Sequence, residues 1–225
     1  MDSLSLAALQ QFPSDIVTAL RIVRGGAATA SDCIWCPQCG SFGLDNPTPP
    51  IEMFQNTMLL GTIIPIIAHG YARLLKMIDV ETELAIAAGQ TKTFRLQDYG
   101  GLFGSQEKIR SMSSCDGGEL SFNSVEMPAQ QWRTTVRALL RVDVYGHEQE
   151  SFKYKGLKDL ITELEIRQTL RHDLLDSMDA GSIHHSMTGH GLFQGPDGKC
   201  LGDKNRGCLN LLKVAKVAID NLVIP

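Results

Sequence analysis

Three cysteines, Cys33, Cys36 and Cys39, form a C-x-x-C-x-x-C motif, the pattern in this chain with the clearest capacity for metal chemistry. Thiolates at this spacing can converge on a zinc ion or an iron–sulfur cluster. Gly43 stands where a bacterial ferredoxin motif carries its next cysteine, which disfavours a cluster. A zinc site would need a ligand from far along the chain, either a histidine or one of Cys115, Cys200 and Cys208. We therefore expect reduced cysteines in a loop, with no metal bound.

The histidines offer less defined chemistry. His184, His185 and His190 cluster in a Gly-rich segment that gives them no fixed geometry, so we expect a solvated loop there. His69 follows an apolar run, where a hydrogen-bonded histidine of the core or its rim is more common than a general base. His147 adjoins Glu148 after a helical pattern, which predicts a solvated turn in preference to an acid–base pair.

The segment Asp98-Tyr99-Gly100-Gly101-Leu102 places an acid and a phenol beside paired glycines, as a substrate-binding loop would. Phosphate binding is not supported, because no strand pattern precedes the segment and no helix start follows it. The sequence also lacks a nucleophile elbow, a P-loop, a dinucleotide fingerprint and a zinc-protease helix. We predict no catalytic, cofactor-binding or metal-binding residues, and the sequence gives no argument for an enzyme.

Length and composition limit the class of protein. A chain of 225 residues that is 43% hydrophobic can bury a substantial core, and we expect one domain over residues 1–225. The net charge of −4 gives no global positive field for nucleic acid. Residues 1–12 carry no basic residue, unlike a secretory signal or a transit peptide. These features predict a soluble intracellular protein with reduced cysteines and no membrane association.

The elements that must position these residues are helical, and the longest is the apolar stretch over residues 51–88. Its apolar side chains recur mostly at steps of three or four, which predicts a helix with one buried face. They are Phe54, Met58, Ile63, Ile67, Tyr71, Leu74, Leu75 and Ile78. Pro65 predicts a kink or break over Gly61–Pro65, and Gly89 predicts the helix end.

Shorter helices are predicted around this segment. The first runs from Pro13 to about Val23, with Ser14 as its cap and Gly25-Gly26 as its end. The second begins at Pro128 and carries Trp132, Val136, Leu139, Leu140 and Val144. The third follows Gly156, with Leu157, Leu160, Ile161 and Leu164 on its apolar face and Arg167 among the charged residues on its other faces. The fourth carries Leu211, Leu212, Ala215, Ile219 and Leu222.

The segments over residues 27–50, 91–127 and 180–207 are rich in glycine or polar residues and are predicted to be mobile loops. Strand signals are almost absent. We therefore predict an all-α fold, an irregular helical bundle around a long kinked central helix.

Short packing segments spread over most of the chain carry a further signal. They are Met58–Thr62, Gly70–Leu75, Lys92–Leu96, Asp98–Leu102, Trp132-Arg133, Thr135–Leu140, Val142–Gly146, Gly156–Asp159 and Ala218–Ile224. As an ordered set they resemble the C-terminal domain of the fungal aflatoxin-pathway regulatory protein family, whose full-length members begin with a DNA-binding binuclear zinc cluster of six cysteines. This resemblance implies nuclear control of the transcription of a secondary-metabolite gene cluster.

The six closely spaced cysteines of that family have no counterpart here, because Cys115 is the next cysteine after the motif at Cys33–Cys39. The resemblance therefore implies an effector or association module without its own DNA-binding part, acting through a DNA-binding regulator or through self-association, in the nucleus or alternatively in the cytoplasm. A second hypothesis is a stand-alone enzyme derived from this domain, which orients a polyketide-like intermediate for cyclisation or isomerisation. A third is a regulator whose zinc-cluster exon is missing from this chain.

Overall fold

The computed structural model describes residues 12–37, 51–99, 124–149, 152–177 and 207–224. Most of them are helical, in α2 (Ile16–Ile34), α3 (Ile51–Ala87), α4 (Leu96–Tyr99), α6 (Ala129–Tyr145), α7 (Leu157–Ser177) and α9 (Gly207–Asp220). Two antiparallel strand pairs accompany the helices: β1 (Thr91–Phe94) with β2 (Val125–Pro128), and β3 (His147–Gln149) with β4 (Phe152–Tyr154). The predicted all-α class is thus right for most of the described chain, but it omits two small sheets.

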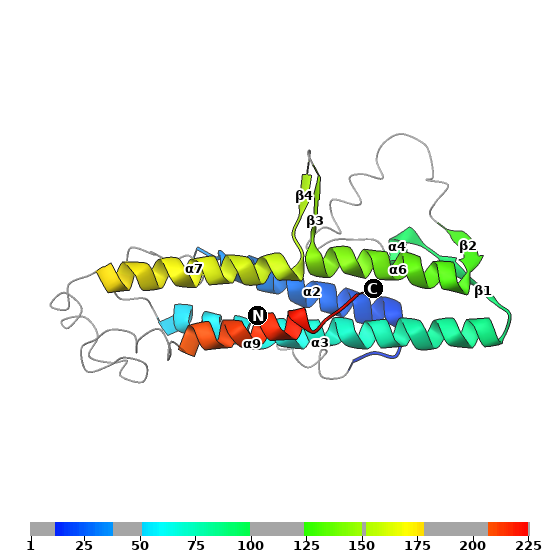
Figure 1. Ribbon diagram of the computed structural model, residues 1–225, viewed down its shortest axis with the longest axis horizontal. Helices are drawn as coiled ribbons and strands as arrows, with labels where there is room; N and C mark the ends of the chain where they lie inside the picture. The colour runs from blue at the N-terminus through cyan, green and yellow to red at the C-terminus, as the bar shows by residue number, and fades with distance from the viewer. Residues whose placement is uncertain (1–11, 38–50, 100–123, 150–151, 178–206, 225) are drawn as a thin grey trace.

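Figure 1 shows α3 running along most of the molecule, with α6 and α7 following one another along the opposite side. The β3–β4 hairpin joins α6 to α7 and projects away from the helices. Helix α2 contacts α3 most extensively, and α9 packs on both α3 and α7. Buried apolar side chains from α2, α3, α6, α7 and α9 form one hydrophobic cluster, so the long helices share a single core.

Helix α2 differs from the prediction at both ends. Its N-cap is Asp15, whose carboxylate accepts a hydrogen bond from the Thr18 amide at 2.7 Å, and Ser14 lies one residue earlier. The helix continues through Gly25-Gly26 and extends the buried face with Ala27, Ala30 and Ile34. Each interior glycine costs about 1 kcal/mol relative to alanine, and burial of the following turns against α3 offsets that cost. The loop predicted from residue 27 is therefore wrong over residues 27–34.

Helix α3 is continuous over its 37 residues, so of the two alternatives predicted over Gly61–Pro65 the break is wrong, whereas the kink stays a prediction. Proline removes one backbone donor, but helices packed along α3 hold the segments on either side of it in place. The predicted buried face is confirmed at Ile67, Tyr71, Leu74, Leu75 and Ile78.

The predicted end of α3 is also confirmed. Gly89 has a φ of +64°, its amide donates to Ile86 O at 3.0 Å, and the Gln90 amide donates to Ala85 O at 2.9 Å. These two bonds form a Schellman motif, in which glycine accepts the left-handed conformation without strain.

Two glycines on α3 permit close contact with neighbouring helices. A Cβ atom on Gly61 would lie 3.0 Å from Leu211 Cβ of α9, and one on Gly70 would lie 2.8 Å from Val23 Cγ2 of α2. The missing side chains therefore set the distance at which α2 and α9 pack on the central helix.

Strands β1 and β2 and helix α4 lie within the loop predicted over residues 91–127, which is wrong for these parts of it. The strands pair from Thr91 with Pro128 to Phe94 with Val125. Four-residue strands give too short an alternating pattern to be recognised, and their pairing joins segments far apart in sequence. Residues 38–50, 100–123 and 178–206, which hold the rest of the predicted loops, lie outside the described residues.

The predicted helices after Pro128 and Gly156 are confirmed as α6 and α7, and the last predicted helix as α9. Pro128 occupies the N-cap of α6, next to its predicted first-turn position. The apolar stripes predicted on these helices are largely buried, including Trp132, Val136, Leu160, Leu164 and Leu212. Helix periodicity therefore identified which faces of these three helices form the core.

Candidate functional site

A buried ion pair connects α2 to α6. Arg24 Nε donates to Asp143 Oδ2 at 2.8 Å, and only 1% of the Asp143 side-chain surface is exposed. Arg24 Nη1 also donates to the backbone carbonyl of Tyr99 at 2.8 Å, so one guanidinium links three helices. The Tyr71 hydroxyl lies close enough to Asp143 to interact electrostatically with its carboxylate. It forms no hydrogen bond of standard geometry within the described part of the chain.

Burial dominates the acid–base properties of this group. Desolvation raises the pKa of Asp143 from 3.8 to about 6, although the Arg24 guanidinium opposes the rise. Burial and then the negative charge of Asp143 raise the pKa of the Tyr71 hydroxyl well above its usual value. The buried carboxylate of Asp143 and the guanidinium of Arg24 hold α6 and α2 together. Because each group is engaged by the other, neither is available as an acid, a base or a ligand-binding charge.

Aromatic side chains enclose the end of the bundle beside this ion pair. The rings of Phe94 and Tyr99 stack at 5.6 Å between centroids, and Tyr99 meets Trp132 edge to face at 6.0 Å. Lys92 Nζ lies 4.9 Å from the Trp132 ring centroid and also pairs with Glu81. Burial, and then the charge of Glu81, raise the pKa of Tyr99 to about 12. Asp98 and Tyr99, whose segment has the composition of a substrate-binding loop and is predicted to be part of a longer loop, lie in α4, where Tyr99 is part of the core.

A second buried polar group lies where α2 ends. Arg167 Nη1 donates to the Ile34 carbonyl at 2.6 Å, and Asn56 Nδ2 donates to the Cys33 carbonyl at 2.9 Å. Arg167 Nη2 and Gln168 Nε2 each donate to Thr57 Oγ1 at 3.0 Å. Asn56 of α3 and Arg167 of α7 thus donate to carbonyls that the last turn of α2 leaves without helical partners. Arg167 is fully buried, so its predicted place on an outer face of α7 is wrong.

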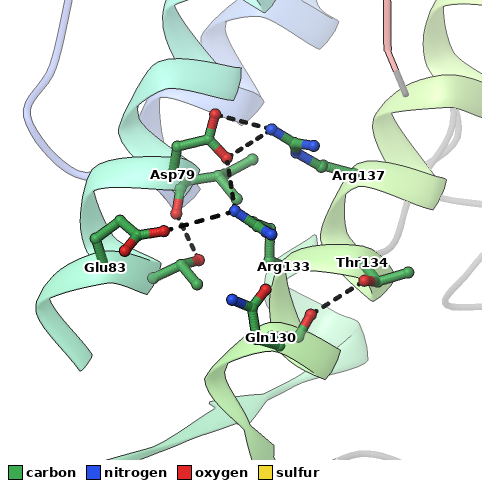
Figure 2. A network of polar contacts seen from close by, with 8 residues as sticks. Asp79, Glu83, Gln130, Arg133, Thr134 and Arg137 are labelled. Atoms are coloured by element: carbon green, nitrogen blue, oxygen red, sulfur yellow. Dashed lines mark hydrogen bonds and ion pairs between the residues drawn. The ribbon is translucent and has the colours of Figure 1, made fainter. Parts of the chain in front are cut away.

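Charged residues at the surface join α3 to α6 (Figure 2). Arg137 Nη2 donates to both carboxylate oxygens of Asp79, at 2.6 and 2.8 Å. Arg133 Nη1 lies 3.9 Å from Asp79 Oδ1 and 3.7 Å from Glu83 Oε1. Pairs of this partly exposed kind stabilise a protein by about 0–1 kcal/mol each. This network links α3 to α6.

Several large apolar side chains are exposed on the outer faces of the helices. They are Val80 and Leu84 on α3, Ile166 and Leu170 on α7, and Val214 and Val217 on α9. The members of each pair are three or four residues apart, so they share one side of their helix. A shallow depression of about 350 Å³ lies beside the first pair, lined by Ser14, Ile16, Lys76, Met77, Val80, Glu81 and Leu84. These exposed pairs are the described features best suited to binding another molecule.

The structure describes two of the three cysteines of the C-x-x-C-x-x-C motif. Cys33 lies in the last turn of α2, Cys36 follows the helix, and Cys39 lies outside the described residues. Burial, and then the charge of Cys36, raise the pKa of the Cys33 thiol. The described residues contain no group of three or more His, Cys, Asp or Glu side chains placed to hold a metal ion.

The structure places His69 and His147 on different elements. His69 is exposed on α3, whereas His147 and Glu148 are exposed in strand β3, so the turn predicted for that pair is wrong. His184, His185 and His190 lie outside the described residues, as do Cys115 and Cys200, while Cys208 lies in α9. The sequence pattern did not predict the buried polar contacts of Arg24, Asp143 and Arg167. A signal existed, because Asp143 continues the apolar spacing of Val136 and Leu140 along α6.

Comparison with protein-family models, with curated proteins and with solved structures finds no match for this chain.

By length and composition alone, α3 could cross a membrane over Gln55–Ala87. In the most apolar 18-residue part of this helix, 44% of the residues are buried inside the structure. Core helices of soluble proteins can be equally long and apolar. The helix is therefore only a weak argument for a membrane span.

Proposed function

We propose that this chain is a protein-association module that acts in the nucleus, in the transcriptional control of a fungal secondary-metabolite gene cluster. The observation that carries the proposal is the set of exposed apolar pairs on α3, α7 and α9, outside a core that is otherwise well packed. Apolar side chains in such positions favour contact with another protein. The resemblance to the C-terminal domain of the aflatoxin-pathway regulators supplies the biological setting.

Charge supports an indirect route to DNA. The chain carries 21 basic and 25 acidic side chains, so DNA would gain little from the electrostatic attraction on which non-specific binding depends. Arg24, Arg133 and Arg137 are engaged in ion pairs with acidic side chains. A partner that carries its own DNA-binding domain would provide the contact with the promoter.

A tethering assay tests the proposal. The full chain is fused to the DNA-binding domain of an unrelated regulator, and a reporter with the matching binding sites is measured in a fungal host. We expect increased transcription, and the loss of most of that increase when Ile166 and Leu170 are both replaced by aspartate. Gln131→Asp combined with Ala138→Asp is the matched control, because both residues are exposed on α6, which carries none of the exposed apolar pairs, and the substitutions add the same two charges. A fusion that leaves transcription unchanged would contradict the proposal.

Deletion of the gene separates regulation from the enzyme hypothesis. We expect the transcripts of the metabolite cluster to fall, and a fluorescent fusion of the chain to accumulate in nuclei. Unchanged transcripts together with the accumulation of one pathway intermediate would instead favour an enzyme that orients a polyketide-like substrate.

A further inference from the structure

Helix α9 exposes two large apolar side chains on the face that turns away from the bundle. Val214 and Val217 are 58% and 57% exposed, whereas Leu212, Ala215 and Ile219 of the same helix are buried. Contacts on both flanks fix this orientation. Leu211 packs against Gly61 of α3, and Lys216 Nζ lies 2.6 Å from Glu165 Oε1 of α7. The two valines therefore have no cover from α3 or α7.

Opposite charges frame the two valines. Lys213 and Asp220 are both exposed and are seven residues apart, close to two helical turns, so they lie on the same side of α9. Neither of them has an ion-pair partner in the part of the chain that the structure describes. A positive end, an apolar centre and a negative end make this face complementary to a copy of itself in the reverse direction.

We propose that α9 is a self-association surface, which packs antiparallel against α9 of a second copy of this chain about a two-fold axis between Lys216 and Val217. In this register Lys213 of each copy lies level with Asp220 of the other, so both ends of the contact pair opposite charges. Val214 and Val217 of the two copies meet at the centre and exclude water. A parallel arrangement would place lysine beside lysine and aspartate beside aspartate, which disfavours it.

This inference rests on the proposed function, because it gives the association module a second contact, with another copy of the chain, beside its contact with the DNA-binding partner. A contact made by one 14-residue helix from each copy lies at the small end of specific interfaces. We therefore expect a dimer that exchanges with monomer at micromolar concentrations.

Sedimentation velocity of the full chain across the micromolar range tests the proposal. The average mass should rise with concentration from the 24.6 kDa of the monomer towards twice that value. Val217→Asp should weaken the dimer at least about tenfold, because two carboxylates would then meet beside the axis. Ile86→Asp is the matched control, because Ile86 is 43% exposed on α3 and lies outside both the proposed contact and the exposed apolar pairs. It should leave the mass at each concentration unchanged.

A charge exchange tests the register. Lys213→Asp alone opposes two carboxylates at each end and should weaken the dimer, whereas Lys213→Asp combined with Asp220→Lys should restore it. This rescue also keeps the test decisive if Val217→Asp were to unfold the chain, which thermal melting by circular dichroism would reveal. A monomer at all concentrations, a dimer that tolerates Val217→Asp when folded, or a charge exchange without rescue would overturn the proposal. Reporter activation by a strictly monomeric chain would overturn this inference alone and leave the proposed function standing.

Discussion

Arg24 and Asp143 are 119 positions apart in the chain, yet Arg24 Nε lies 2.8 Å from Asp143 Oδ2 inside the core. The pair joins the middle of α2 to the last turns of α6, and the same guanidinium holds the carbonyl of Tyr99. Ionisation of a buried carboxylate is costly, so this contact makes the stability of the fold depend on pH.

The first prediction concerns that pH dependence. The pKa of Asp143 is about 6 in the folded chain against 3.8 for its ordinary value, so the folded state holds the proton more tightly. The contribution of this group to stability is therefore fully present below about pH 4 and is lost as the pH rises to about 6. The loss amounts to roughly 3 kcal/mol. Urea unfolding at several pH values should show it when the unfolding free energies are compared with those of Asp143→Asn.

The comparison removes the contributions of all other titrating groups, because both proteins share them. Between pH 4 and 6 the wild-type chain should lose stability relative to Asp143→Asn. Asp173→Asn, at an exposed position on α7, is the control for the replacement of an aspartate by asparagine. Parallel profiles for Asp143→Asn and the wild type would show that Asp143 does not titrate in this range.

The second prediction concerns the two partners of the ion pair. Arg24→Met leaves a buried carboxylate without its counter-charge, and Asp143→Leu leaves the guanidinium without its own. Each single substitution should lower the free energy of unfolding by about 3–5 kcal/mol at neutral pH. The double substitution replaces both charges by apolar groups and should cost much less than the sum of the two. Additive losses in chemical unfolding would show that the two groups do not interact.

Helix periodicity predicted the core faces of α3, α6, α7 and α9, because packing on one side of a helix imposes its spacing directly on the sequence. It did not predict that α2 continues past Gly25-Gly26, and at Pro65 it left open whether α3 kinks or breaks. In both cases contacts with other helices outweigh an unfavourable local residue, and those contacts are set by segments far away in the chain.

The buried polar residues were harder to predict for the same reason. Arg167 follows Leu164 at core spacing, but its charge favours the surface unless distant partners are known. Those partners are Ile34 and Thr57, which are 133 and 110 positions away. The exposed apolar pairs on α3, α7 and α9 all lie off the apolar stripes predicted for these helices, but their exposure also depends on which distant segments cover that side of each helix.

The third prediction compares two helical glycines. A Cβ atom on Gly70 would lie 2.8 Å from Val23 Cγ2, so Gly70→Ala should push α2 from α3 and destabilise the fold by about 1–3 kcal/mol. A Cβ atom on Gly25 meets nothing within 4 Å, and Gly25→Ala should stabilise the chain by about 0.5–1 kcal/mol through better helix propensity. Thermal unfolding of both variants checks the signs. A stabilising Gly70→Ala would mean that the two helices can separate without cost.

The fourth prediction compares two arginines of different environment. Arg167 is fully buried and donates to the Ile34 carbonyl and to Thr57, whereas Arg133 is partly exposed and pairs at longer distances with Asp79 and Glu83. Arg167→Met keeps much of the side-chain volume but leaves buried acceptors without donors, and should lower stability by about 2–4 kcal/mol. Arg133→Met should cost no more than about 1 kcal/mol. Hydrogen exchange adds a local measurement. The amides in the last turn of α2 should exchange faster in Arg167→Met than in the wild type, and at the wild-type rate in Arg133→Met. Equal losses of stability for the two variants, with unaltered exchange in α2, would show that Arg167 does not anchor the end of that helix.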